Sequence, residues 1–189
     1  MTPPNAKPRL LVVPHLYAEN ICVREIEFAR RLTDAFDVFC LKWDDALHVD
    51  AASALGRRAR QVGVAVASAI APRRLERAAD GVTYVSVPVL QPILLRRIVG
   101  DERAQAVAER RNHRVLEKVL RECAITHALL ASEAFGIPER HDVKVFFDLV
   151  DWFPEESATP AQLVAIRARL AEMACRAHAV FVVSEPLAE

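Results

Sequence analysis

The stretch Val143-Lys-Val-Phe-Phe-Asp-Leu-Val-Asp-Trp-Phe-Pro-Glu-Glu156 decides the fold class of this chain. It begins as an apolar run, rich in β-branched and aromatic residues and too short for a helix, and it ends in carboxylates beside a proline. Further along, Ala179-Val-Phe-Val-Val-Ser-Glu-Pro-Leu187 repeats this pattern. Such runs are typical of buried parallel strands, whose carboxyl ends carry polar groups to the sheet edge where ligands bind.

Apolar runs of this kind alternate along the chain with segments of helical periodicity. In the first helical segment, for example, Ile26, Ala29 and Leu32 lie three residues apart. Strands are predicted at 9–14, 36–43, 81–88, 127–131, 143–149 and 179–184, and helices at about 22–35, 51–70, 101–123 and 160–176. This alternation, with few hairpin signals, predicts an α/β, doubly wound, mainly parallel, Rossmann-like sheet.

Length and composition indicate one domain with a sizeable core. The chain has 189 residues, of which 52% are hydrophobic. We expect residues 1–8, which are polar and rich in proline, to form an extended or disordered tail, and 9–189 to form the domain. We also expect residues 10–13, 143–149 and 180–183 to be buried strands, because their apolar runs do not alternate with polar residues.

Cysteine usage and the lack of targeting segments suggest a cytoplasmic protein. The four cysteines are far apart, form no C-x-x-C pair and lie in apolar segments, which is typical of buried thiols in a reducing compartment. The first apolar run stops at Pro14, too early for a signal peptide. No apolar stretch approaches the roughly 20 residues of a membrane span. The cytoplasm is the expected location, and attachment to the inner face of the membrane is an open alternative.

The glycine pattern argues against the commonest ligands of this fold. All five glycines are isolated, so the chain has neither a dinucleotide fingerprint nor a phosphate-binding loop. A G-x-S-x-G nucleophile elbow is also absent. Two residues separate Asp148 from Asp151, so they do not form a D-x-D metal clamp. We therefore expect this domain to bind no cofactor and no metal. The net charge is zero, which gives no global reason to expect nucleic acid as a partner.

Four features together resemble the amino-terminal half of a GT-B glycosyltransferase of the family-4 type. They are the opening strand and its loop, a basic segment leading into Asp80-Gly-Val-Thr-Tyr-Val-Ser-Val-Pro88, the Phe-Phe-Asp-Leu-Val-Asp-Trp-Phe-Pro strand end, and Ala-Val-Phe-Val-Val-Ser-Glu-Pro-Leu. The resemblance covers nearly the whole chain. It implies a Rossmann-like domain that binds a glycan, lipid-linked or small-molecule acceptor. The nucleotide-sugar donor, a co-substrate, would bind a carboxyl-terminal half outside this chain.

On this resemblance the chain is half of an enzyme, and we expect it to be inactive alone. In a retaining transferase no covalent nucleophile is needed, because positioning and stabilisation of the leaving diphosphate carry the catalysis. The rival interpretation is a non-catalytic, flavodoxin-like binding or interaction module.

Two carboxylates are the candidate catalytic residues. Asp148 and Asp151 lie at a predicted strand end, where a carboxylate could accept a hydrogen bond from an acceptor hydroxyl and orient it for attack at the anomeric carbon. The alternative is that one of them caps the next loop or pairs with an arginine.

The candidate substrate-binding residues follow the first and last strands. His15 and Asn20 belong to the first loop, which lacks the glycines that many relatives carry and would therefore bind through side chains or take an unusual acceptor. Ser184 and Glu185 follow the last strand, although a serine before a proline is also ordinary helix-start chemistry.

A basic segment is the candidate membrane-facing surface. Its arginines are Arg57, Arg58, Arg60, Arg73, Arg74 and Arg77. They suit binding to an anionic membrane surface, where lipid-linked acceptors occur. Residues 93–98 again combine apolar and basic side chains. A solvated helix face in an arginine-rich protein is the alternative.

Overall fold

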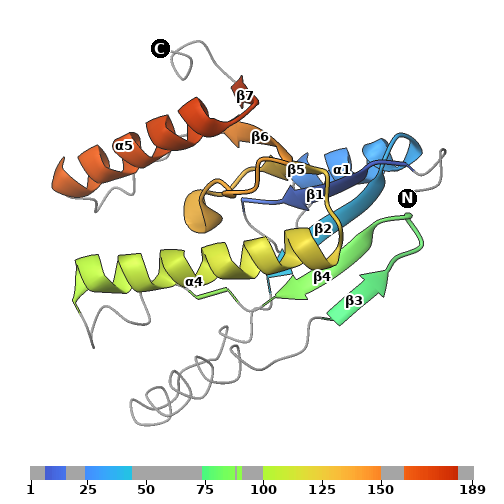
Figure 1. Ribbon diagram of the computed structural model, residues 1–189, viewed down its shortest axis with the longest axis horizontal. Coiled ribbons are helices and arrows are strands. Elements are labelled where there is room, and N and C mark those ends of the chain that lie inside the picture. Colours follow the sequence, from blue (N-terminus) through green and yellow to red (C-terminus); the bar gives the residue numbers. More distant parts are fainter. Residues whose placement is uncertain are drawn as a thin grey trace, which may run out of the picture.

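The computed structural model describes residues 7–15, 24–43, 74–87, 89–90, 100–149 and 160–182. Within these residues seven strands form one sheet in the order β3-β4-β2-β1-β5-β6-β7 (Figure 1). The strands are β1 (Arg9–Val13), β2 (Asp37–Trp43), β3 (Arg74–Arg77), β4 (Thr83–Val87), β5 (His127–Leu130), β6 (Lys144–Leu149) and β7 (Ala179–Val182). All neighbouring pairs are parallel except β3 with β4, which confirms the predicted mainly parallel sheet.

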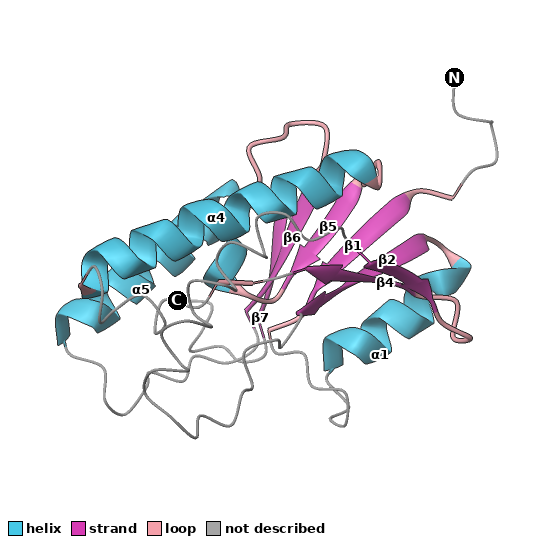
Figure 2. Ribbon diagram, turned by 90° about the horizontal axis from the view of Figure 1, so that it is seen from below, coloured by secondary structure: helices cyan, strands magenta, loops and turns pink. Residues whose placement is uncertain are grey.

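The described helices cover the two faces of the sheet unequally. Helix α1 (Arg24–Arg31) lies on one face, and α4 (Asp101–Glu122) and α5 (Pro160–Arg176) lie on the other (Figure 2). Right-handed crossovers explain this division: the step from β1 to β2 runs along the sheet in one direction, whereas those from β4 to β5 and from β6 to β7 run in the other. Two short 3₁₀ helices, η1 (Leu32–Asp34) and η2 (Glu133–Phe135), complete the described elements.

Strand β1 is the centre of the core. Its register with β2 and β5 fixes it between two parallel neighbours. Leu10 and Val12 pack in the cluster beneath α1, whereas Leu11 and Val13 pack in the larger cluster beneath α4 and α5, and all four are buried. A strand enclosed on both faces needs apolar residues at every position, which is why this short run does not alternate.

Strand β3 corrects one prediction. The sequence predicted no strand between residues 43 and 81, but Arg74–Arg77 pairs with β4 as an antiparallel hairpin. The turn closes with a hydrogen bond from the Gly81 N–H to the Ala78 carbonyl, 3.1 Å. Leu75 is the only apolar residue of this strand and is 56% exposed. The strand therefore has no apolar run from which the sequence could predict it. Asp80-Gly81, a favoured hairpin turn pair, was the signal that the sequence did contain.

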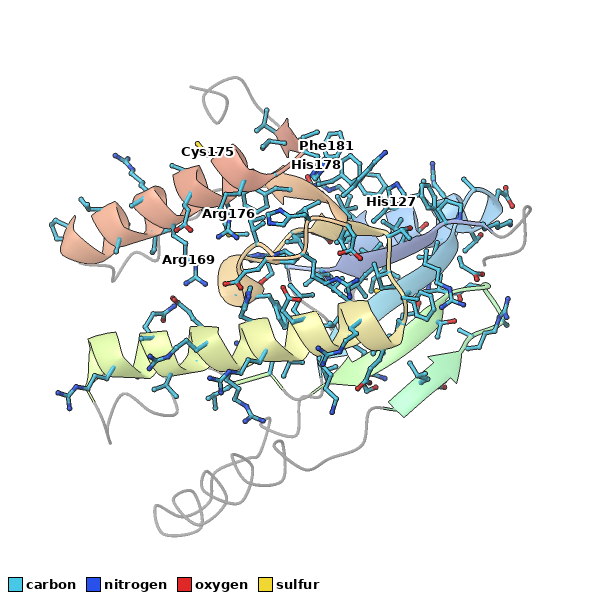
Figure 3. The ribbon with its side chains drawn as sticks, in the orientation of Figure 1. His127, Arg169, Cys175, Arg176, His178 and Phe181 are labelled. Atoms are coloured by element: carbon cyan, nitrogen blue, oxygen red, sulfur yellow. The ribbon has the colours of Figure 1, made fainter. Side chains whose placement is uncertain are left out.

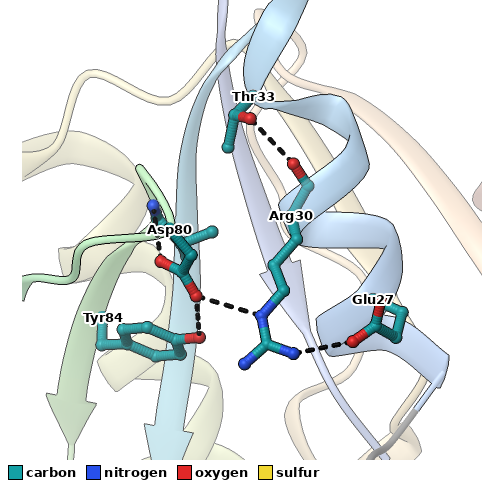
Figure 4. Close-up of polar contacts among 6 residues, drawn as sticks. Glu27, Arg30, Thr33, Asp80 and Tyr84 are labelled. Carbon is teal, nitrogen blue, oxygen red and sulfur yellow. Dashed lines mark hydrogen bonds and ion pairs between the residues drawn. The ribbon is translucent and has the colours of Figure 1, made fainter.

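A polar cluster ties this hairpin to α1 (Figure 4). Asp80 accepts hydrogen bonds from the Val82 N–H at 3.1 Å, Arg30 Nε at 3.0 Å and the Tyr84 hydroxyl at 3.2 Å. Arg30 also pairs with Glu27 at 2.7 Å. Burial opposes ionisation of Asp80, but these hydrogen bonds outweigh it and lower the pKa of its carboxyl. The cluster lies where α1 ends and β4 begins, at the amino edge of the sheet.

The last strand and one cysteine also depart from prediction. Residues 179–182 form β7 as predicted, but Val180, Phe181 and Val182 are 36%, 52% and 38% exposed, so the predicted burial is wrong. The reason is position: β7 has β6 on one side and no described strand on the other. Cys40 and Cys123 are buried as expected, whereas Cys175 is exposed on α5.

Gly81 gives a test of the hairpin. Its φ is 84°, and an added Cβ would meet Thr33 side-chain atoms at no less than 3.6 Å, so a substitution costs conformational rather than steric energy. We expect Gly81→Ala to lower the free energy of unfolding by about 1–2 kcal/mol, because L residues disfavour this conformation. Gly81→Asn is the matched control and should cost less, because asparagine tolerates positive φ. Urea unfolding measures both, and equal losses would contradict the explanation.

Candidate functional site

Three adjacent strands deliver polar residues to the carboxyl edge of the sheet. His15 follows β1, Ser132 follows β5, and Asp148 is the next-to-last residue of β6. His15 is exposed, whereas Ser132 and Asp148 are only 2% and 4% exposed. The Ser132 hydroxyl accepts a hydrogen bond from the Ala134 N–H at 3.3 Å and so shapes the turn into η2. This is the edge at which open α/β sheets bind ligands.

Asp148 is held by an arginine from the same edge. Arg24, the first residue of α1, donates from Nη2 to Asp148 Oδ2 at 2.6 Å. The Asp148 side chain is 5% exposed and that of Arg24 is 35% exposed, so the pair lies at the boundary between interior and solvent. The Arg24 guanidinium also lies over the Phe28 ring, 5.6 Å from its centre. Arg24 Nε is buried and has no hydrogen-bond partner.

The pair has a defined electrostatic balance. Burial raises the pKa of the Asp148 carboxyl, and the charge and hydrogen bond of Arg24 offset only part of this rise. A carboxylate so enclosed is poorly accessible to an acceptor hydroxyl. The exposed part of the pair is the arginine, whose five N–H donors cannot all be used by one carboxylate oxygen.

Glu25 adds a second buried carboxylate beneath the start of α1. It is 3% exposed, and it shares the buried side of the helix with Ile26 and Ala29. Burial, with a smaller contribution from the charge of Glu25, raises the pKa of the Cys40 thiol to about 12. The sequence reasoning missed Arg24, Glu25 and Ser132. A usable signal existed for Glu25, because it lies four residues before Ala29 on the apolar stripe of a short helix.

Most of the predicted site residues lie outside the described residues. These are Asp151, Asn20, Ser184, Glu185, Arg57, Arg58, Arg60 and Arg73. Of the remainder, Asp148 and His15 lie at the carboxyl edge, Arg74 opens β3, and Arg77 is exposed at the end of β3. The structure therefore brings Asp148 together with Arg24. The sequence analysis allowed for pairing with an arginine but did not identify which one.

A row of aromatic rings crosses the α1 face of the sheet toward β7. His127 contacts Phe36 with ring centres 5.4 Å apart and stacks on Phe146 at 6.3 Å, and Phe146 stacks on Phe181 at 6.2 Å. Figure 3 shows His127 and Phe181 among the side chains around these strands. Burial and the charge of Lys144 lower the pKa of His127, so its ring stays neutral at physiological pH.

The described residues contain neither a metal site nor a membrane-spanning helix. No group of three histidine, cysteine or carboxylate side chains among them is placed to hold a metal ion. None of the helices in the same part of the chain is both long and apolar enough to cross a bilayer.

The same fold occurs in a solved sugar-transferring enzyme. The structure of E. coli trehalose-6-phosphate synthase with UDP-2-fluoro glucose matches 94% of this chain with a TM-score of 0.56 and 14% sequence identity. The match spans 40% of that enzyme's chain. No protein-family model matches the sequence, and no curated protein is significantly similar to it. The chain is thus a Rossmann-like α/β domain with the fold of one half of a GT-B glycosyltransferase.

Asp148→Asn tests the electrostatic state of the site. A raised pKa means that the folded protein binds this proton more tightly than the unfolded chain, whose pKa is near 3.8. The free energy of unfolding of the parent should therefore fall as pH rises above 3.8, until Asp148 is ionised in the folded state too. The variant lacks this contribution, so its stability relative to the parent should rise over that window. Urea unfolding at a series of pH values measures the difference.

Asp34→Asn, on the exposed η1 segment, controls for the loss of one negative charge. Stabilities of the Asp148 variant and the parent that run parallel across the whole series would contradict the raised pKa.

Proposed function

We propose that this chain is the acceptor-side domain of a GT-B glycosyltransferase related to family 4. In the complete enzyme a sugar would pass from a nucleotide-sugar donor to a glycan, lipid-linked or small-molecule acceptor. Three observations support the proposal: the shared fold with a sugar-transferring enzyme, the absence of glycine-rich phosphate loops, and the polar residues at the carboxyl edge.

The observation that carries the proposal is the Arg24–Asp148 pair. The buried Asp148 carboxylate fixes the Arg24 guanidinium at the carboxyl edge of the sheet. This reduces the conformational entropy that the arginine side chain must lose on binding. We assign Asp148 as the positioning residue and Arg24 as the group that contacts the acceptor, donating to its hydroxyl or acidic oxygens. His15, exposed beyond β1, would line the same edge. The role first considered for Asp148, accepting a hydrogen bond from the acceptor hydroxyl to orient it for attack, does not suit a carboxylate that is 5% exposed.

The division of labour between the two halves leads to a binding prediction. Nucleotide sugars should not bind this chain measurably, because its isolated glycines cannot cradle a diphosphate. Isothermal titration with UDP-glucose and GDP-mannose is the measurement. Tight binding of either compound would overturn the assignment of the donor to another domain.

A second prediction concerns the acceptor. A panel of neutral and phosphorylated hexoses, titrated into the labelled chain, should shift backbone amide signals at the carboxyl edge, in residues 13, 15, 24–26 and 131–132. Arg24→Ala should abolish the shifts caused by the sugars that bind. Arg31→Ala, which removes an exposed arginine from the opposite end of the same helix, should leave them unchanged. Binding that survives in Arg24→Ala would remove Arg24 from the site.

If no sugar in the panel shifts any signal while a protein partner occupies the same edge, the chain is the flavodoxin-like interaction module instead.

A further inference from the structure

Helix α4 carries a straight row of cations on its solvent face. The exposed basic residues of this helix are Arg103, Arg110, Arg114, Lys118 and Arg121. At 3.6 residues per turn they fall within about 80° of one another around the helix, and they extend along about 27 Å of its axis. We call these five residues the α4 basic stripe.

The charges of this stripe are largely uncompensated. Lys118 lies 4.0 Å from Glu122, a weak exposed contact. Within the described part of the chain, the four arginines of the stripe form no ion pair with a carboxylate. Two acidic residues of the helix have partners elsewhere: Glu109 pairs with Arg169 of α5, and Glu117 accepts a hydrogen bond from the Glu139 N–H at 2.8 Å. The stripe therefore presents a net positive line to solvent although the chain as a whole has no net charge.

Apolar side chains are exposed on the same side of the sheet as these cations. Val107 is 39% exposed and lies within the stripe, between Arg103 and Arg110. Leu75 on β3 is 56% exposed and pairs with Val85, which packs in the core beneath α4, so Leu75 is on the α4 face of the sheet. Arg77, two residues further on, shares that face, whereas Glu76 is on the other.

We propose that the α4 basic stripe, with Val107, docks this domain on an anionic lipid surface. Guanidinium and ammonium groups would lie among the lipid phosphates, while the exposed valine enters the boundary with the acyl chains. The inner face of α4 is buried in the core, so the helix does not insert; it lies flat on the surface. A nucleic acid fits less well, because phosphates offer nothing to exposed valine and leucine side chains. The inference is independent of the proposed sugar-transfer function.

The geometry also orients the domain. The helix runs antiparallel to the strands, and its outer face points away from the sheet (Figure 2). Docking through this face places the strands roughly along the lipid surface and leaves the carboxyl edge, with Arg24 and Asp148, open at the side.

The test compares two variants that each reverse two charges. Arg110→Glu/Arg114→Glu changes the stripe, whereas Arg31→Glu/Lys144→Glu changes two exposed residues away from it, on α1 and β6. Co-sedimentation is measured with phosphatidylcholine vesicles that contain or lack phosphatidylglycerol. Each cation near such a surface contributes about fivefold to binding, so the stripe variant should bind the anionic vesicles at least about 30-fold more weakly. The control variant should retain the parent's binding.

Three further measurements keep the outcome clear. Melting followed by circular dichroism establishes that each variant is folded, and Arg110→Gln/Arg114→Gln replaces the reversal if that variant is not. Val107→Gln keeps every charge and should still weaken binding to the anionic vesicles. Raising the salt concentration should release the parent, because the interaction decays over about 8 Å at physiological ionic strength.

Three results would overturn the proposal: equal binding of the parent to both vesicle types, equal weakening in the stripe and control variants, or tighter binding of a DNA duplex than of anionic vesicles.

Discussion

The burial of β1 on both of its faces is the constraint on which the rest of the structure depends. Leu10 and Val12 fill the cluster under α1, and Leu11 and Val13 fill the cluster under α4 and α5. Parallel pairing with β2 and β5 satisfies the backbone of this strand on both sides. Since parallel neighbours need crossovers of a fixed hand, the position of β1 decides which helix covers which face and where each loop emerges.

The two ends of α1 illustrate the consequence. The helix begins at the carboxyl edge, where Arg24 meets the buried Asp148, and ends at the amino edge, where Arg30 meets Asp80. The second connection locks the β3–β4 hairpin against the helix and so fixes its orientation. The first connection joins residues on elements far apart in sequence, with its charged face at the edge where this fold takes ligands. One short helix thus links a structural cluster to the candidate site.

The two faces of the sheet present different surfaces. On the α4 side, helix–helix and helix–loop contacts use Glu109 and Glu117, and the exposed cations of the α4 basic stripe face outward. On the α1 side, a single described helix leaves a row of rings running from Phe36 to the half-exposed Phe181. A chain with no net charge therefore carries one cationic face and one aromatic face. The handedness of the crossovers decides which helices cover each face, and the exposed side chains of those elements give each face its character.

The sequence by itself determined the fold class, because unbroken apolar runs such as 10–13 and 145–147 mark strands that are covered on both faces, and helical periodicity marks what separates them. It also placed Asp148 at a strand end. Only the tertiary structure decided that Arg24 holds this carboxylate, because the two residues are 124 positions apart and meet through the strand order. Likewise, β7 has an apolar sequence but lies exposed at one end of the described sheet, and β3 pairs through its backbone with only one apolar side chain. The local sequence pattern indicates which secondary structure a segment can form. The residues that surround the segment in the folded protein decide how deeply it is buried and which charged groups it contacts.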